Sequence, residues 1–245
     1  MDKQNFLDII GDTHGDLDRF FGSGFVGEDR LGRGDAVLVC GDFSFMFQPE
    51  DPAFSRYYVE ERHRLDELEH KPYDILFVDG NHENFDRLND LPVEERYGGR
   101  VHRLRRNIFH LMRGEIYDIL GYRIFAFGGA MSTDRSSRRL GETYWADEIP
   151  SSRDYKNAGA NLARVRNKVD VVVTHTAPLS IVMQLGGFPD QRERELLGFL
   201  DWVYRDISFE RWFFGHWHQD IDFGNIRGIM FDTVSLPARI ARGRE

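Results

Sequence analysis

The chain has 245 residues, of which 41% are hydrophobic and 13% aromatic, enough apolar side chain for a sizeable folded core. Its 41 acidic and 32 basic residues give a net charge of −9, which disfavours sequence-independent binding to duplex nucleic acid. The N-terminus lacks a signal-peptide pattern, and no apolar run approaches the roughly 20 residues that span a bilayer. Because a single cysteine, Cys40, excludes an internal disulfide, we expect a soluble cytoplasmic protein without a membrane partner.

The first third of the chain alternates between strands and helices. Short apolar runs that end at glycine predict buried strands over residues 6–10, 36–40 and 75–78. A short helix over 17–21 follows the first strand, and a charged amphipathic helix over 52–70 follows the second. This order is typical of parallel crossover units.

The remaining elements are more loosely spaced. Strands are predicted over 107–112, 115–120, 122–127, 169–173, 211–214 and 229–234, helices over 154–168 and 191–206, a polar loop over 131–152, a mobile loop over 186–189 and a frayed tail from 239. Because we find no repeat, low-complexity segment or linker, we expect a single domain over residues 1–245.

Five strand ends carry side chains that could bind a metal. They are Asp12 with His14, Asp42, Asn81 with His82, His175, and His216 with His218. Carboxylates and imidazoles together suit Mn²⁺, Fe²⁺ or Zn²⁺. This number of ligands is too large for one tetrahedral ion and fits two ions. Taken alone, each of these histidines would more simply be a hydrogen-bonded core or surface residue. We assign that simpler role to the other four histidines, His63, His70, His102 and His110.

The ordered motifs resemble those of the calcineurin-like metallophosphoesterases. They are Gly11-Asp12-Thr13-His14-Gly15, Gly41-Asp42, Gly80-Asn81-His82-Glu83, Thr174-His175 and Gly215-His216-Trp217-His218. The resemblance implies an α/β fold, a four-layer α/β/β/α sandwich of two mixed sheets, with two divalent ions above the strand ends. It implies that Asp12, His14 and His218 hold one ion, that Asn81, His175 and His216 hold the other, and that Asp42 bridges them. We expect Mn²⁺, with Fe or Zn as alternatives, and His82 would face the substrate.

Such a site is suited to the hydrolysis of a phosphate ester. Two ions neutralise phosphate oxygens and lower the pKa of a water between them, which yields a metal-bridging hydroxide as the nucleophile. His82, as an imidazolium, can protonate the departing oxygen or stabilise its charge, and Glu83 is read as a supporting carboxylate. We slightly favour a phosphomonoester, because the acidic chain has no basic groove pattern. The alternatives are a phosphodiesterase acting on nucleotides or nucleic acid, a catalytically silent metal-binding scaffold, and a hydrolase of a lactam or thioester.

Two positions depart from the protein-phosphatase pattern within this family. Phe45 stands where those proteins have an Asp that orients the catalytic His, and Asp79 stands where they have a phosphate-binding Arg. We expect Asp79 to repel phosphate, which weakens the case for a phosphoprotein substrate.

The polar loop after residue 130 contains candidates for substrate binding. Arg135 and Arg138, with Arg139 beside them, could replace the missing phosphate clamp, although an exposed basic loop is the alternative. Tyr144 and Trp145 could stack on a base, but we expect them to pack on the domain.

Overall fold

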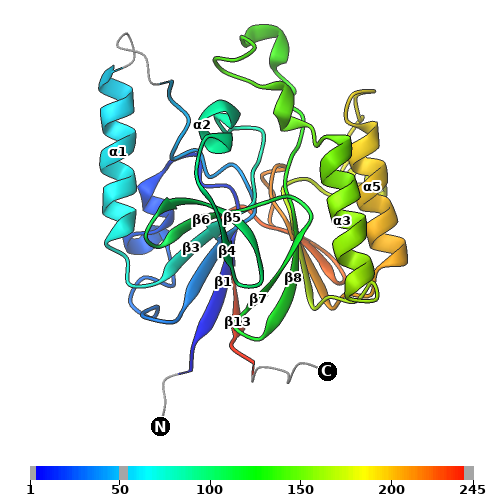
Figure 1. Cartoon of the computed structure of the whole chain (residues 1–245). Helices are drawn as coiled ribbons and strands as arrows, with labels where there is room; N and C mark the ends of the chain where they lie inside the picture. The colour runs from blue at the N-terminus through cyan, green and yellow to red at the C-terminus, as the bar shows by residue number, and fades with distance from the viewer. Residues whose placement is uncertain (1–3, 50–54, 240–245) are drawn as a thin grey trace.

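The structure is a computed structural model that describes residues 4–49 and 55–239. Within these ranges, two sheets face each other and helices cover their outer faces (Figure 1). The first sheet has the order β13-β1-β2-β3-β6-β5-β4 and the second the order β11-β12-β10-β9-β8-β7. The centre of each sheet is parallel and antiparallel strands lie at its edges, so both sheets are mixed.

The bounds of the elements are as follows. The first sheet contains β1 (Phe6–Ile10), β2 (Ala36–Val39), β3 (Asp74–Phe77), β4 (Val93–Arg96), β5 (Gly99–Arg105), β6 (Ile108–Leu111) and β13 (Thr233–Pro237). The second contains β7 (Glu115–Ile119), β8 (Tyr122–Phe127), β9 (Val171–Thr174), β10 (Arg211–Phe214), β11 (Ile221–Phe223) and β12 (Ile226–Gly228). The α-helices are α1 (Ser55–Glu69), α2 (Phe85–Asn89), α3 (Ser152–Arg164), α4 (Leu179–Gln184) and α5 (Arg194–Asp206).

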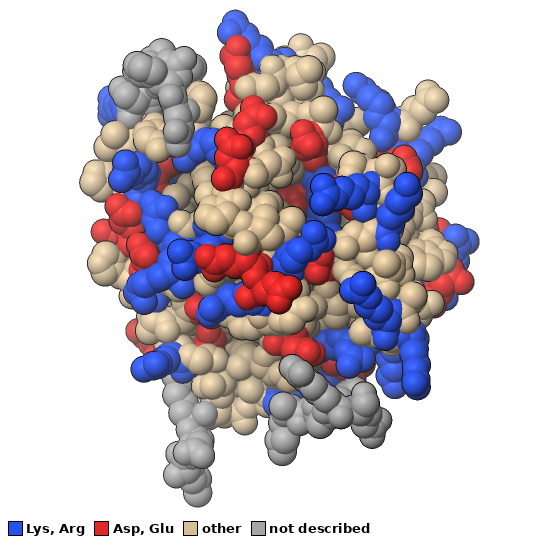
Figure 2. All heavy atoms as spheres, viewed as in Figure 1, with Lys and Arg blue, Asp and Glu red and all other residues tan. Residues whose placement is uncertain are grey.

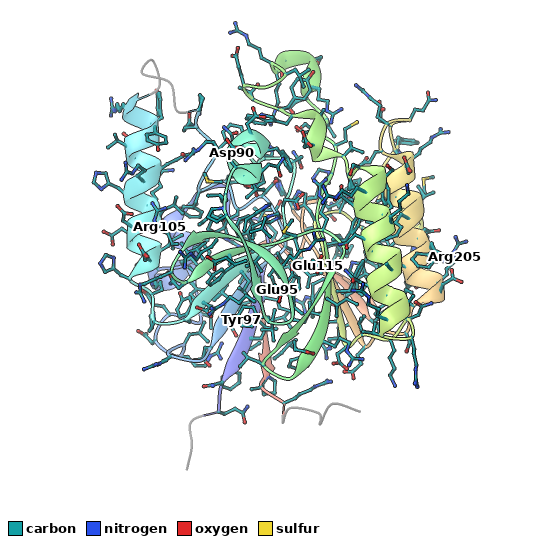
Figure 3. The ribbon with its side chains drawn as sticks, viewed as in Figure 1. Asp90, Glu95, Tyr97, Arg105, Glu115 and Arg205 are labelled. Carbon is teal, nitrogen blue, oxygen red and sulfur yellow. The ribbon has the colours of Figure 1, made fainter. Side chains whose placement is uncertain are left out.

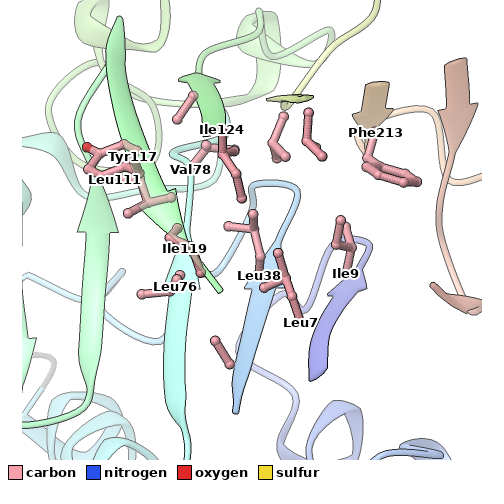
Figure 4. Close-up of a cluster of buried hydrophobic side chains, with 14 of the residues drawn as sticks. Leu7, Ile9, Leu38, Leu76, Val78, Leu111, Tyr117, Ile119, Ile124 and Phe213 are labelled. Carbon is pink, nitrogen blue, oxygen red and sulfur yellow. The ribbon is translucent and has the colours of Figure 1, made fainter. Parts of the chain in front are cut away.

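The layers follow from the alternation of side chains along each strand. In β2, Leu38 packs into the cluster between the sheets, which Figure 4 shows, whereas Val37 and Val39 belong to the cluster that includes the apolar side of α1. On the other side, α3 and α5 cover the second sheet with apolar residues such as Leu162 and Leu200. The predicted four-layer α/β/β/α sandwich is confirmed.

An ion pair joins the two sheets near their edges. Glu115, at the start of β7, lies near the centre of Figure 3, and its Oε1 accepts a hydrogen bond from Arg100 Nε of β5 at 2.8 Å. The Tyr117 hydroxyl of β7 donates to the carbonyl of Arg100 at 2.5 Å. These contacts fix the second sheet against the first at the edge opposite β13 and β11.

Most predicted strands and helices lie within a few residues of the observed ones, with three informative exceptions. The strand predicted over 229–234 is wrong, because the backbone N–H groups of Met230 and Phe231 donate to the Asp220 carboxylate and the last strand, β13, begins at Thr233. The helix predicted over 154–168 ends at Arg164, since Arg166 and Asn167 have φ of 55° and 54°.

The third exception is a group of elements that the sequence did not predict: the long strand β5 and the shorter elements α2, α4, β4, β11 and β12. Parts of three predictions, the polar N-terminus, the start of the helix over 52–70 and the tail from 239, lie outside the described residues. Residues 4–49 and 55–239 contain no helix with the length and hydrophobicity that a bilayer span requires.

Candidate metal centre and active site

The five polar strand ends meet above the two sheets. Three strands of the first sheet, β1, β2 and β3, are followed by Asp12 with His14, by Asp42, and by Asn81 with His82. In the second sheet, β9 is followed by His175, and β10 by His216 and His218. All seven predicted metal ligands therefore lie close together. Parallel neighbouring strands produce this arrangement, because their carboxyl ends meet at one edge of a sheet.

The contacts divide these side chains into two groups. In the first group, His218 Nε2 lies 3.1 Å from Asp12 Oδ2 and 3.1 Å from His14 Nε2. In the second, His175 Nε2 lies 3.1 Å from Asn81 Oδ1, and the rings of His175 and His216 are 5.0 Å apart.

Asp42 lies between the two groups. One of its carboxylate oxygens is 3.3 Å from His175 Nε2 and the other is 3.9 Å from His14 Nε2. Asp42 is thus close to a histidine of each group, and its role as a bridge between two ions stays a prediction.

The chemistry of this site fits divalent cations. Asp12 and Asp42 are buried carboxylates whose close neighbours are imidazole rings, and groups of three such side chains converge well enough to hold an ion. Burial disfavours a charged His175, but the carboxylates of Asp42 and Asp12 outweigh it and raise the pKa of His175 to about 10. The site therefore attracts positive charge. Its mixture of nitrogen and oxygen ligands suits Mn²⁺, Fe²⁺ or Zn²⁺.

One hydrogen bond prepares His175 for a metal. Its Nδ1 lies 2.8 Å from the backbone carbonyl of Cys40, which can only accept, so Nδ1 carries the proton. The other ring nitrogen, Nε2, therefore faces the centre of the site and is the one that would bind a metal after losing its own proton.

The backbone at the site is strained. His14, Asp42, His216 and His218 have φ of 47°, 47°, 63° and 49°, in the left-handed region that residues with a Cβ rarely adopt. Such strain is characteristic of functional sites, where the surrounding structure maintains it.

Two of the motif glycines are required by close packing. A Cβ on Gly80 would lie 2.0 Å from Asp42 Oδ1, and one on Gly215 would lie 2.0 Å from Asp12 Oδ1. The glycines of the motifs therefore allow the chain to pass directly behind the two carboxylates.

His82 faces a cavity beside these groups. Its backbone N–H donates to Asp42 Oδ1 at 2.7 Å, and its ring lies edge-on to that of His14 with centroids 5.2 Å apart. The cavity, of about 220 Å³, is also lined by Phe47, Tyr57 and Arg64. Burial lowers the pKa of His82. The negative charge of Asp42 opposes this shift, and the positive charge of Arg138 adds to it.

The three arginines of the polar loop have different surroundings. Arg138 places its Nη1 and Nη2 atoms 3.3 and 3.2 Å from the ring nitrogens of His82. Arg135 instead donates from Nε and Nη2 to Glu148 Oε2 at 3.2 and 2.9 Å. Arg139 is largely exposed and lies 3.5 Å from Glu142.

The two aromatic residues of this loop are used in packing, as expected. Trp145 is buried against Phe47, with centroids 5.7 Å apart, and its Nε1–H donates to Asp86 at 2.8 Å. Tyr144 lies under the guanidinium of Arg135.

The prediction that Asp79 repels phosphate is wrong. Asp79 is buried and accepts hydrogen bonds from Arg113 Nε at 2.8 Å and from His110 Nε2 at 3.0 Å. Burial opposes its charge, but Arg113 and His110 outweigh burial and hold the pKa of this carboxyl well below its usual range. Asp79 is therefore an ionised buried carboxylate whose charge is compensated by Arg113 and His110, rather than a group that faces the substrate.

Glu83 and Phe45 both lie in the protein interior next to the site. Glu83 is buried and accepts from the backbone N–H groups of Phe43 at 2.8 Å and Ser44 at 3.2 Å, in agreement with its reading as a supporting carboxylate. Burial, together with Asp42, raises the pKa of Glu83. Phe45 packs in the core against Phe43.

Several residues of the site were not predicted from sequence: Arg64, His110, Arg113, Ser132 and Glu148. Arg113 follows the end of β6 by two residues and precedes Gly114, but it was passed over because arginine is not a residue type that binds metal. The other four lie outside the short motifs by which the proposed ligands were found, and Ser132 follows the end of β8 by five residues.

The structure thus combines two mixed sheets with a cluster of carboxylates and imidazoles above their strand ends. A family model described as calcineurin-like phosphoesterase matches residues 7–220, and the chain belongs to this family. Its members depend on two metal ions.

Among proteins of known function, the chain is similar to lariat debranching enzymes. The human enzyme is 27% identical over 190 residues, which cover 71% of this chain and 32% of that protein. The enzyme of Caenorhabditis briggsae is 23% identical over 214 residues, which cover 77% and 38%. The chain thus matches about a third of the length of these curated relatives. A solved phosphopantetheinyl hydrolase from Mycobacterium tuberculosis aligns over 94% of this chain and 89% of its own with 16% identity and a TM-score of 0.43.

Proposed function

We propose that this protein hydrolyses a phosphate ester at a dinuclear centre in which Asp12, His14 and His218 bind one ion and Asn81, His175 and His216 the other, with Asp42 shared. The observation that carries the proposal is the position of Asp42, which lies within 4 Å of a histidine of each group. When bound, the two ions supply neutralisation of the phosphate oxygens and a nucleophile at neutral pH.

The protein side chains around the centre bind and orient the substrate. Arg138 lies beside His82, where its guanidinium can grip a phosphate oxygen with charge-assisted hydrogen bonds. A phosphate there offsets the positive charge of Arg138, which favours a protonated His82 that can donate to the leaving oxygen. Arg64 lines the cavity that His82 faces and can contact the part of the substrate beyond the phosphate.

The preferred substrate is a phosphomonoester. Two guanidinium groups, Arg138 and Arg64, flank His82 and can balance the higher charge of a monoester. On the face shown in Figure 2, basic and acidic side chains are interspersed without a basic stripe suited to a polymer. The second candidate is a phosphodiester of a nucleotide or nucleic acid, which the similarity to enzymes named for the debranching of lariats favours.

Three further features belong to this proposal. Both ions are Mn²⁺, which the mixed set of nitrogen and oxygen ligands suits. Fe and Zn suit the same ligands and are the alternatives. The chain is one domain, because a single apolar cluster joins both sheets. The enzyme works in the cytoplasm, since its lone cysteine is a buried free thiol.

The test is hydrolysis of an aryl phosphate and its diester by the Mn²⁺-reconstituted protein. Asp42→Ala should abolish both activities, whereas Asp118→Ala, which changes an exposed carboxylate on β7, should leave them unchanged. Activity that survives in Asp42→Ala would refute the metal assignment. A higher kcat/KM for the diester would decide for the second candidate.

His82 is tested separately from the metal ligands. His82→Ala should keep two ions bound, measured by calorimetric titration, while kcat falls by roughly 10²–10⁴-fold because a general acid is lost. Loss of an ion from this variant would make His82 a metal ligand and contradict its proposed role.

A further inference from the structure

Behind Asn81 lies a buried chain of polar side chains that the proposed mechanism does not use. Asn81 Nδ2 donates to Ser132 Oγ at 3.2 Å, and Ser132 Oγ donates to Glu148 Oε1 at 2.9 Å. Arg135 pairs with the second oxygen of Glu148, which also accepts from the backbone N–H of Ser132 at 3.0 Å. Asn81, Ser132 and Glu148 are only 3%, 1% and 0% exposed, so water does not compete for these hydrogen bonds.

The chain of hydrogen bonds determines which way the Asn81 side chain points. A serine hydroxyl has one proton, and here it is given to the Glu148 carboxylate, which can only accept. Ser132 Oγ can therefore only accept from Asn81, so the NH₂ end of the amide faces Ser132. The carboxamide oxygen must then point the other way, to His175 Nε2 at 3.1 Å and the proposed metal centre.

The orientation is important because only one end of the amide can bind a cation. The carboxamide oxygen carries lone pairs, whereas the NH₂ group has only hydrogens to offer. The two ends have nearly the same shape, so packing alone does not distinguish them. A hydrogen bond of fixed direction does, and groups that orient a metal ligand in this way commonly change metal affinity by about 10–100-fold.

Glu148 and Arg135 give the serine its direction. Without Glu148 the hydroxyl of Ser132 could rotate and donate to the amide oxygen instead. A fully buried carboxylate requires a cation to compensate its desolvation, and Arg135 provides one at 2.9 Å. This explains why Arg135 pairs with Glu148 and is not among the residues that line the cavity beside His82.

We propose that Ser132, held by Glu148 and Arg135, is a positioning residue that keeps the carboxamide oxygen of Asn81 directed at the metal centre. The inference rests on the proposed role of Asn81 as a metal ligand. It assigns to the polar loop after β8 a part in metal binding, although none of its side chains is a proposed ligand.

The experiment measures Mn²⁺ binding to the metal-stripped full chain by isothermal titration calorimetry. Ser132→Ala should weaken one of the two binding events by about 10–100-fold and leave the other within about twofold. Ser132→Thr keeps a hydroxyl and should restore most of the affinity. Ser137→Ala is the matched control, because it removes an exposed hydroxyl of the same loop that bonds to the Asp134 carbonyl.

A second measurement does not depend on the metal. In the ¹⁵N spectrum of the metal-free protein, the side-chain amide of Asn81 is assigned by its absence from Asn81→Ala. Its NH₂ protons should exchange slowly in the wild type and in Ser137→Ala, and much faster in Ser132→Ala. The dispersion of the backbone amide signals in the same spectrum shows whether Ser132→Ala is folded.

The outcomes separate the two proposals. If Asn81→Ala weakens one binding event while Ser132→Ala behaves like Ser137→Ala in both measurements, the positioning role is refuted and the proposed function stands. If Asn81→Ala leaves Mn²⁺ binding unchanged, the ligand assignment and the positioning role are both overturned.

Discussion

The buried pair of Asp79 and Arg113 makes the stability of the protein sensitive to a single substitution. Asp79 is 1% exposed and the Arg113 side chain 9%, so Arg113→Met, which keeps most of the side-chain length, would leave the carboxylate buried beside His110 alone. At a charge separation of roughly 4 Å and an effective dielectric constant of about 20, the lost attraction is about 4 kcal/mol. Removing one partner of a buried pair typically costs 3–5 kcal/mol, and with His110 retained we expect a loss of about 3 kcal/mol.

The assays are urea unfolding, which gives the free energy, and thermal unfolding of the metal-free protein, both followed by far-UV circular dichroism. For a chain of this size the expected loss should lower the thermal midpoint, Tm, by about 6–12 °C. Arg205→Met is the control, because Arg205 lies on the outer side of α5 (Figure 3), is 67% exposed and is 3.8 Å from Asp201, an arrangement that contributes roughly 0.5 kcal/mol or less. Adding Asp79→Asn to Arg113→Met should recover roughly half of the loss, since the unpaired buried charge is removed with its partner.

Two results would refute this reasoning. One is an unfolding free energy for Arg113→Met that falls no further than that of Arg205→Met. The other is a lower KM for phosphate esters in Asp79→Asn, which would return Asp79 to the role of repelling the substrate.

Two further predictions concern the active site. Gly80→Ala should lower Mn²⁺ affinity by more than about tenfold, because the new Cβ would lie 2.0 Å from the carboxylate of Asp42, a proposed metal ligand. Gly198→Ala in α5 is the control. A Cβ there meets open space, so this change should stabilise the protein by roughly 0.5–1 kcal/mol. Calorimetric titration and urea unfolding of both variants test this pair, and equal Mn²⁺ affinities would contradict it. Arg138→Ala should lower kcat/KM by roughly 10–100-fold with both ions retained, since a charged hydrogen bond contributes about 1.5–3 kcal/mol, while Arg139→Ala should change little. Equal kinetics in these two variants would remove Arg138 from the substrate site.

The sequence predicts the fold and the cluster of polar strand ends because each depends on a short pattern. A buried strand followed by glycine and a polar side chain can be recognised in a few residues, and parallel pairing brings such ends together. Strands such as β4 and β5 are missed because they are rich in charged residues near the edge of a sheet. In β4, Glu94 to Arg96 are all charged and read as a surface loop, and β5 has three arginines among its seven residues.

Partners in three dimensions are harder to predict than motifs. Asp79 carries a charge that the local sequence leaves uncompensated, and its compensation comes from Arg113, 34 residues along the chain. The role of Arg135 likewise depends on Glu148, since an arginine in a polar loop looks the same whether it faces a substrate or a buried carboxylate. The partner of each charged side chain depends on which residues are buried together, and a single sequence does not contain that information directly.

The left-handed backbone of His14, Asp42, His216 and His218 has a consequence for how this protein can evolve. For residues with a Cβ this conformation costs roughly 1–2 kcal/mol each, and glycine adopts it without that cost. Glycine at position 14 or 218 should therefore make the metal-free chain more stable while removing a proposed ligand. Selection for stability and selection for activity oppose each other at these four positions, so a relative that has abandoned catalysis is expected to lose these side chains first.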